Sequence, residues 1–165
     1  MSGSKNYRLD GRSEEEFRKQ IKDRTQQERT LFIWWLDLLE RTTGTRPTFE
    51  DTGCGKDGEY LPDSEVTMAP DFTVEGYGKV EVKFAKPMIA RTFHLKVGQV
   101  KSYHKVGASI LMVNGADSEI PKFTMLDTAA LKQIIDFCEV CRWQGFGGKP
   151  AYRIPVELFI WRDLK

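Results

Sequence analysis

The segment from residue 70 to residue 84 constrains the fold more than any other part of the chain. It reads Pro-Asp-Phe-Thr-Val-Glu-Gly-Tyr-Gly-Lys-Val-Glu-Val-Lys-Phe. Apolar and polar side chains alternate on both sides of the Gly-Tyr-Gly turn, which is the pattern of β-strands with one buried face. The sequence therefore predicts a β-hairpin over residues 70–85, with the apolar side chains of both strands on the core face.

The charged residues of this hairpin are expected to gather on its other face. If both apolar sets face the core, a three-residue loop at 76–78 pairs Glu75 with Lys79. Asp71 and Glu81 then become diagonal neighbours, about 7–8 Å apart at the backbone. Two carboxylates at that spacing can reach one divalent cation. The alternative interpretation is an exposed strand face on which charges alternate.

The rest of the chain is predicted to contain three helices. The first covers residues 13–41, where apolar residues recur at helical spacing after a capping-box sequence at Ser13 and Glu16. The other two are expected at about 92–106 and 128–143.

Strands are expected at 48–50, 108–113 and 152–161, in addition to the hairpin. The order of helices and strands predicts an α/β fold with a mixed central β-sheet flanked by helices. Because a chain of 165 residues favours one core, we expect a single domain over residues 13–165 after a loose segment at 1–12.

Composition narrows the class of protein. The net charge of +1 does not suit a protein that passively coats nucleic acid. The three cysteines, Cys54, Cys138 and Cys141, are too few for a disulfide framework, and we expect them to be core or free thiols. No apolar run reaches the roughly 20 residues of a membrane span. A soluble, cytoplasmic protein without a membrane segment is therefore expected.

Pro70-Asp71 and, nine residues later, Glu81-Val82-Lys83 resemble the signature of the PD-(D/E)xK nuclease superfamily. The resemblance implies a restriction-endonuclease-like core, built from a helix, a three-stranded meander, a second helix and a strand. It also implies that Asp71 and Glu81 bind Mg²⁺, for which Mn²⁺ can substitute. The backbone carbonyl of Val82 would add an oxygen ligand, and Lys83 would act on the attacking water.

A second part of the sequence supports this resemblance. Gln99-Val100-Lys101-Ser102-Tyr103 is similar to a Gln-x-x-x-Tyr motif found in one branch of the superfamily, which includes RecB-type nuclease domains, Cas4-like proteins and phage λ-type exonucleases. Gln99 and Tyr103 are four residues apart and so share one helix face. The resemblance implies that Gln99 hydrogen-bonds the lysine, the water or the DNA backbone. The alternative is a surface glutamine and a packed tyrosine.

Glu28 is a further candidate ligand. It lies seven residues after Ile21 and seven before Trp35, so it falls on the apolar face of the first helix. A buried carboxylate is costly unless it is paired or bound to a metal. The resemblance implies that Glu28 joins the metal site, whereas the alternative is a glutamate at the edge of the apolar face, paired with a nearby arginine.

Residues after the motif are candidates for contact with nucleic acid, because basic side chains suit phosphates. They are Lys86, Arg91, Lys96, Lys101 and Tyr103. A solvated helix face is the alternative for Lys101. The loops at 46–69 and 143–150 are the expected places for substrate recognition, since long loops on a rigid core often carry it.

Together these features predict a Mg²⁺-dependent endonuclease that hydrolyses DNA. A DNA exonuclease acting on ends and a non-catalytic nucleic-acid-binding module of the same fold remain alternatives, and RNA remains open as the substrate. A homodimer would suit the cutting of both strands of a duplex.

Overall fold

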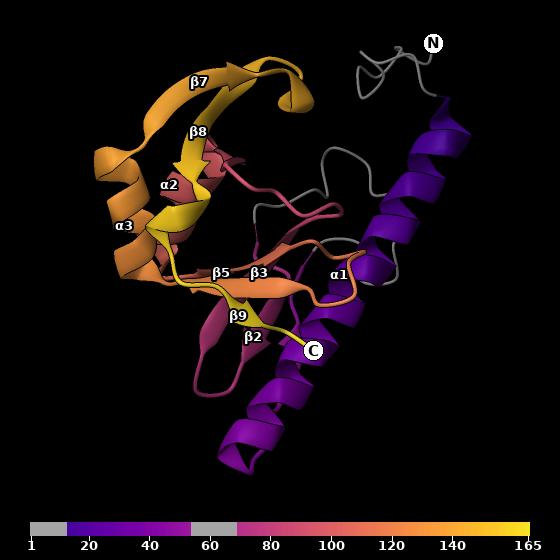
Figure 1. The fold of residues 1–165 in the computed structure, drawn as a ribbon. Helices are drawn as coiled ribbons and strands as arrows, with labels where there is room; N and C mark the ends of the chain where they lie inside the picture. Colours follow the sequence, from indigo (N-terminus) through magenta and orange to yellow (C-terminus); the bar gives the residue numbers. More distant parts are fainter. Residues whose placement is uncertain (1–12, 54–68) are drawn as a thin grey trace.

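The computed structural model describes residues 13–53 and 69–165, and these form an α/β fold (Figure 1). The predicted loose segment at 1–12 and Cys54 lie outside the described residues. The helices are α1 (Glu14–Thr43), α2 (Val97–Val106) and α3 (Thr128–Phe137). The strands are β1 (Phe49–Asp51), β2 (Phe72–Val74), β3 (Gly78–Ala85), β4 (Thr92–Lys96), β5 (Ser109–Asn114), β6 (Lys122–Leu126), β7 (Glu139–Trp143), β8 (Lys149–Pro155) and β9 (Arg162–Asp163). Short 3-10 helices follow β7 and β8, at Gln144–Phe146 and Val156–Leu158.

The long first helix begins and ends where the sequence predicts. The Ser13 hydroxyl accepts a hydrogen bond from the Glu16 N–H, and the Glu16 carboxylate accepts one from the Ser13 N–H, which completes a capping box. Gly44 ends the helix with a φ of 77°, a left-handed conformation that glycine adopts without strain. In the described part of the chain, no helix has the length and apolar character that crossing a bilayer requires.

The strands form two sheets. The larger has six strands in the order β1-β2-β3-β5-β6-β9, and it is mixed because β3 and β5 run parallel while the other neighbours are antiparallel. The smaller sheet is antiparallel, in the order β4-β8-β7. The predicted α/β class and mixed sheet flanked by helices are confirmed, but the second sheet was not predicted.

Two segments predicted to be helical are strands. Residues 92–96 form β4 rather than the first turn of α2, and residues 139–143 form β7 rather than the end of α3. Both pair with β8, which lies between them. The cause is tertiary: β8 supplies the backbone partners of both segments, and helical local preference gives way to this pairing. Cys138 consequently caps α3 and Cys141 lies on β7, and both are free thiols.

Two further strands were not predicted from the sequence. Strand β6 pairs with β5 over five residue pairs, and the short β9 pairs with β6 near the C-terminus. The predicted last strand at 152–161 is shifted, because β8 covers Lys149–Pro155 and a 3-10 turn follows. Short strands with few alternating residues carry little periodic signal, so pairing with a neighbouring strand determines whether they form.

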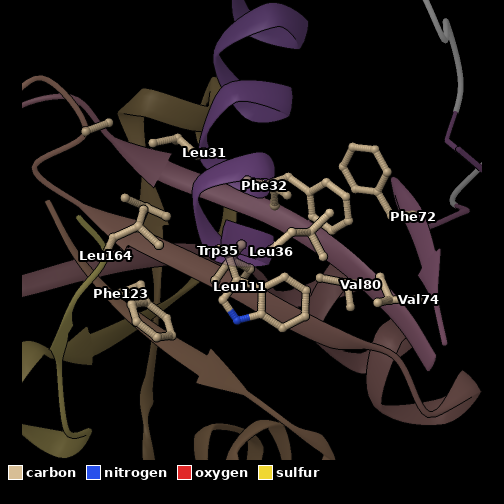
Figure 2. Close-up of a cluster of buried hydrophobic side chains, with 13 residues drawn as sticks. Leu31, Phe32, Trp35, Leu36, Phe72, Val74, Val80, Leu111, Phe123 and Leu164 are labelled. Carbon is tan, nitrogen blue, oxygen red and sulfur yellow. The ribbon is translucent and has the colours of Figure 1, made fainter. Parts of the chain in front are cut away.

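The larger sheet separates two clusters of buried side chains. Along β5, Leu111 and Val113 face α1, whereas Ile110 and Met112 face α2 and α3. On the α1 side, Phe32 stacks on Phe72 with ring centroids 3.8 Å apart and planes 6° apart (Figure 2). Helix α1 thus closes one face of the sheet, and α2 and α3 lie on the other (Figure 1).

The hairpin of β2 and β3 forms, but in a shifted register. Its pairs are Phe72 with Val80, Thr73 with Lys79 and Val74 with Gly78. The loop has three residues as predicted, yet it covers residues 75–77 rather than 76–78, so the predicted pairing of residues 75 and 79 is wrong. The apolar side chains still share one face, because a shift of the loop by one residue preserves the alternation.

Candidate active site

Asp71 lies at the start of the hairpin, immediately before β2. In an antiparallel hairpin the two residue numbers of every pair have the same sum, which is 152 for the three observed pairs. Residues 71 and 81 have this sum too. Continuing the register therefore puts Asp71 level with Glu81, not diagonal to it as predicted. Glu81 is on the sheet face opposite α1, because its neighbours Val80 and Val82 pack in the cluster against α1. The two carboxylates thus lie closer together than the sequence indicated.

The Asp71 side chain is fixed by the next strand. Its Oδ2 accepts a hydrogen bond from the backbone N–H of Val82 over 2.9 Å. Within a β-strand, the N–H and C=O of one residue point to the same neighbour. The Val82 carbonyl therefore points toward Asp71 as well, at the edge of β3 where β2 has ended.

Glu81 contacts a cation and a phenol. Lys83 Nζ lies 2.6 Å from Glu81 Oε1, and the two side chains are only 17% and 8% exposed. The Tyr103 hydroxyl, reaching from α2, hydrogen-bonds Glu81. Burial, followed by the charge of Glu81 and this hydrogen bond, raises the pKa of Tyr103. Tyr103 is itself 2% exposed, so its placement suits a group that orients Glu81 rather than one that contacts nucleic acid.

Asp71 is the most perturbed carboxyl group of the site. Burial, and then the negative charges of Glu81 and Glu28, raise its pKa to about 7. The hydrogen bond from Val82 and the charge of Lys83 act in the opposite direction but are smaller. Three carboxylates therefore act on one another in a space with little water, which is the electrostatic setting of a cation-binding site.

Glu28 brings α1 to the same cluster. Burial raises its pKa, while Arg24 and Lys83 lower it and Glu81 raises it further. Arg24 Nε lies 3.1 Å from Glu28 Oε1. Glu28 is thus paired with an arginine, as the alternative interpretation required, and it also lies within electrostatic reach of Lys83 and Glu81.

The end of β1 supports Asp71 from the other side, and the sequence alone did not reveal this. The backbone N–H groups of Thr52 and Gly53 donate to the Asp71 carbonyl over 2.9 and 3.0 Å. A Cβ at Gly53 would lie 3.0 Å from Asp71 Cα and 3.2 Å from its Oδ1. Glycine therefore lets β1 approach Asp71 this closely. The only local signal was a glycine directly after a short strand pattern.

The remaining predicted residues fall into two groups. Gln99 is half-buried on α2, one turn before Tyr103. Lys96 precedes α2, and its pKa is lowered by burial and then by the charges of Lys149, Lys83 and Arg24, so it lies near the site. The other basic candidates are exposed and are not among the principal charges acting on Asp71 or Glu28: Lys86, Arg91 and Lys101.

The side chains of the cluster suit a hard cation by their chemistry. Carboxylates of Asp71, Glu81 and Glu28 and the Val82 carbonyl are oxygen donors, which Mg²⁺ prefers. Across residues 13–53 and 69–165, however, no three His, Cys, Asp or Glu residues converge tightly enough to hold an ion. The negative charges of Glu81 and Glu28 are instead compensated by basic side chains of the same cluster. Lys83 pairs with Glu81, and Arg24 pairs with Glu28.

This arrangement offers paired carboxylates, one of them with a pKa near neutrality, beside a half-buried ammonium group. Such a set can bind a divalent cation and stabilise negative charge that develops on a phosphate. Comparison of the chain with protein-family models, with curated proteins and with solved structures found no match.

Proposed function

We propose that the protein is a metal-dependent endonuclease that hydrolyses phosphodiester bonds of DNA at Asp71, Glu81 and Lys83. One observation carries the proposal: Asp71 is level with Glu81 and bonded to the N–H of Val82, and Lys83 contacts Glu81 on the same face. Two acidic groups and one ammonium group thus meet at the open edge of β3.

The order of elements supports a restriction-endonuclease-like core of the PD-(D/E)xK superfamily. Helix α1 is followed by the antiparallel meander β1-β2-β3, then by α2, and then by β5, which is parallel to β3. The short strand β4 is inserted before α2. This is the sequence of helix, meander, helix and strand that the Pro-Asp and Glu-Val-Lys motif implies.

Asp71, Glu81 and the Val82 carbonyl would supply the protein oxygens for a Mg²⁺ ion, or Mn²⁺ in its place, and waters would fill the rest of its coordination shell. When bound, such an ion polarises the scissile phosphate and lowers the pKa of a coordinated water. Asp71 must be ionised to bind it. Since the pKa of Asp71 is about 7, we propose that cleavage increases as pH rises through neutrality.

The remaining side chains of the site position the ammonium group of Lys83 and the reacting groups. Glu81 holds Lys83 Nζ at 2.6 Å, so the ammonium group is fixed before the substrate arrives and can stabilise the attacking oxygen or the developing phosphorane charge. Tyr103 in turn orients Glu81 through its hydroxyl. Gln99, on the same face of α2, is assigned to hydrogen-bond the attacking water or a phosphate oxygen.

The test is a cleavage assay on supercoiled and linear duplex DNA with Mg²⁺ or Mn²⁺. Lys83→Ala should abolish cleavage and leave DNA binding largely intact. Lys79→Ala is the matched control, because Lys79 is on the same face of β3 but is exposed at the turn. The wild-type protein should also lose activity in EDTA. Cleavage by Lys83→Ala at the wild-type rate would refute the assignment.

Two alternatives have specific support. Gln99 and Tyr103 share one face of α2, and the Gln-x-x-x-Tyr resemblance favours an exonuclease acting on DNA ends, which would degrade the linear substrate and spare the circular one. The internal pairing of Lys83 with Glu81 and of Arg24 with Glu28 favours a binding module of the same fold without catalysis. Such a module would bind both DNA forms and cut neither.

A further inference from the structure

One face of the smaller sheet packs on helices, and the other carries most of its charged side chains. Side chains of β4 and β8 pack on α2 and α3 through alternate residues, namely Phe93, Leu95, Tyr152 and Ile154. By the same alternation, the opposite face carries His94 and Lys96 on β4, Arg153 and Ala151 on β8, and Glu139, Cys141 and Trp143 on β7. In Figure 1 this sheet lies on the opposite side of the larger sheet from α1.

Two ring contacts join the far end of the β7–β8 hairpin to β4. His94 stacks on Trp143 with centroids 3.7 Å apart and planes 7° apart. Lys96 Nζ lies 5.3 Å from the centroid of the Phe146 ring. Lys149 is paired with Trp143 where the hairpin turns. The turn of the hairpin, residues 143–149, is therefore fixed beside Lys96.

Lys96 also connects this turn to the candidate active site. It is the N-cap residue of α2, the helix whose Tyr103 hydrogen-bonds Glu81. The charges of Lys149, Lys83 and Arg24 all act on Lys96. Three cationic side chains thus lie close enough to Lys96 to repel its charge. Such a concentration of like charge favours a polyanion over a neutral partner.

Carboxylates do not neutralise Lys96 or Lys149. Among the described residues, every ion pair involves other basic groups, so neither Lys96 nor Lys149 has a carboxylate partner. The one acidic residue on this face, Glu139, is paired with Arg153 at the other end of the hairpin. Uncompensated positive charge is therefore confined to the end that lies next to Lys83.

We propose that Lys96, at the end of β4, and Lys149, at the turn of the β7–β8 hairpin, bind the phosphate backbone of the nucleic-acid strand beside the bond that is cut. This inference rests on the proposed nuclease function. The contact is independent of base sequence, because lysine reads a phosphate as a point charge. Phe146 is half-buried beneath Lys96, so it supports the ammonium group rather than stacking on a base.

The test measures binding without cleavage. Anisotropy of a labelled 20-base-pair duplex in EDTA, recorded from about 50 to 200 mM salt, gives the slope of log K against log[salt]. Each phosphate contact contributes about 0.9 to this slope. The double variant Lys96→Gln, Lys149→Gln should therefore reduce the slope by about 1.8 and bind at least tenfold more weakly. Lys96→Arg with Lys149→Arg should retain the wild-type slope.

A matched control removes the same charge elsewhere. Lys79 and Lys105 are exposed and lie outside the smaller sheet, so Lys79→Gln with Lys105→Gln should leave the slope near the wild-type value. An equal loss of binding in both double variants would overturn the inference. A Lys96→Gln, Lys149→Gln protein that loses binding to polyglutamate but keeps its binding to duplex DNA would overturn it as well. The nuclease proposal is judged separately, because it depends on cleavage by Lys83→Ala and not on the salt slope.

Discussion

The backbone N–H of Val82 donates to Oδ2 of Asp71 over 2.9 Å. This bond exists because β2 ends too early: its last pair toward that end is Phe72 with Val80. On the edge of β3 facing β2, the next N–H is that of Val82, which has no strand partner there. The Asp71 carboxylate takes the place of the missing strand. Its second oxygen, Oδ1, is on the side of Gly53.

Replacing Asp71 by asparagine should separate stability from catalysis. The asparagine side chain would keep an oxygen that accepts from the Val82 N–H but would lose the charge that Glu81 and Glu28 repel. Asp71→Asn should therefore raise the midpoint of thermal unfolding at pH 8 without metal, and it should abolish metal-dependent cleavage. A lower midpoint at pH 8 would show that repulsion is not the dominant effect at this residue.

The metal-free protein should become less stable as pH rises. The pKa of Asp71 is about 7 in the folded protein and its usual value is 3.8, so between these values the folded state binds more protons than the unfolded state. The free energy of unfolding then falls from about pH 4 to pH 7, by about 1.4 kcal/mol for each unit of pKa difference. Urea unfolding in EDTA from pH 5 to pH 8 measures this, and Mg²⁺ should stabilise the protein more at pH 8 than at pH 5.

Removing one hydroxyl should test the role of Tyr103. Tyr103→Phe keeps the buried ring but removes the hydrogen bond to Glu81, and a hydrogen bond to a charged group contributes about 1.5–3 kcal/mol. We expect weaker activation by Mg²⁺ and a lower cleavage rate. Tyr152→Phe is the control, because Tyr152 is buried in the same cluster and shares its 2% exposure. Equal losses in the two variants would indicate a packing effect.

A methyl group at residue 53 should displace Asp71. The added Cβ of Gly53→Ala would meet Asp71 Cα at 3.0 Å, closer than ordinary contact. We expect cleavage to fall at least tenfold while circular dichroism shows a folded protein. Gly98→Ala is the control, since nothing lies within 4 Å of a Cβ there and alanine favours the helix by about 0.5–1 kcal/mol. Full activity in Gly53→Ala would show that the site tolerates movement of Asp71.

The packing of α1 on the sheet should dominate global stability. Phe32 is fully buried and stacks on Phe72, so Phe32→Ala should reduce the free energy of unfolding by about 3–5 kcal/mol. Phe137, at the end of α3, is 80% exposed, and Phe137→Ala should change it by less than about 0.5 kcal/mol. Chemical denaturation of both variants compares them directly. A small effect at Phe32 would mean that α1 contributes little to the core.

Local sequence patterns were enough to predict several structural features of this protein. The capping box at Ser13 and Glu16 and the left-handed Gly44 set the limits of α1. Alternation put Glu81 and Lys83 on one face of β3. These features depend on interactions between residues a few places apart in the chain. They can therefore be predicted from a short stretch of sequence. The same alternation predicted a three-residue hairpin loop, although not its position.

Only the tertiary structure decided the rest. Residues 92–96 and 139–143 became strands because β8 lies between them. The register that sets Asp71 level with Glu81 depends on where β2 ends, and the support from Gly53 depends on the approach of β1. The pKa of Asp71 likewise depends on Glu28, which lies on a different element 43 residues earlier. Such effects come from groups distant in the chain, because burial and charge act through space and local periodicity does not encode them.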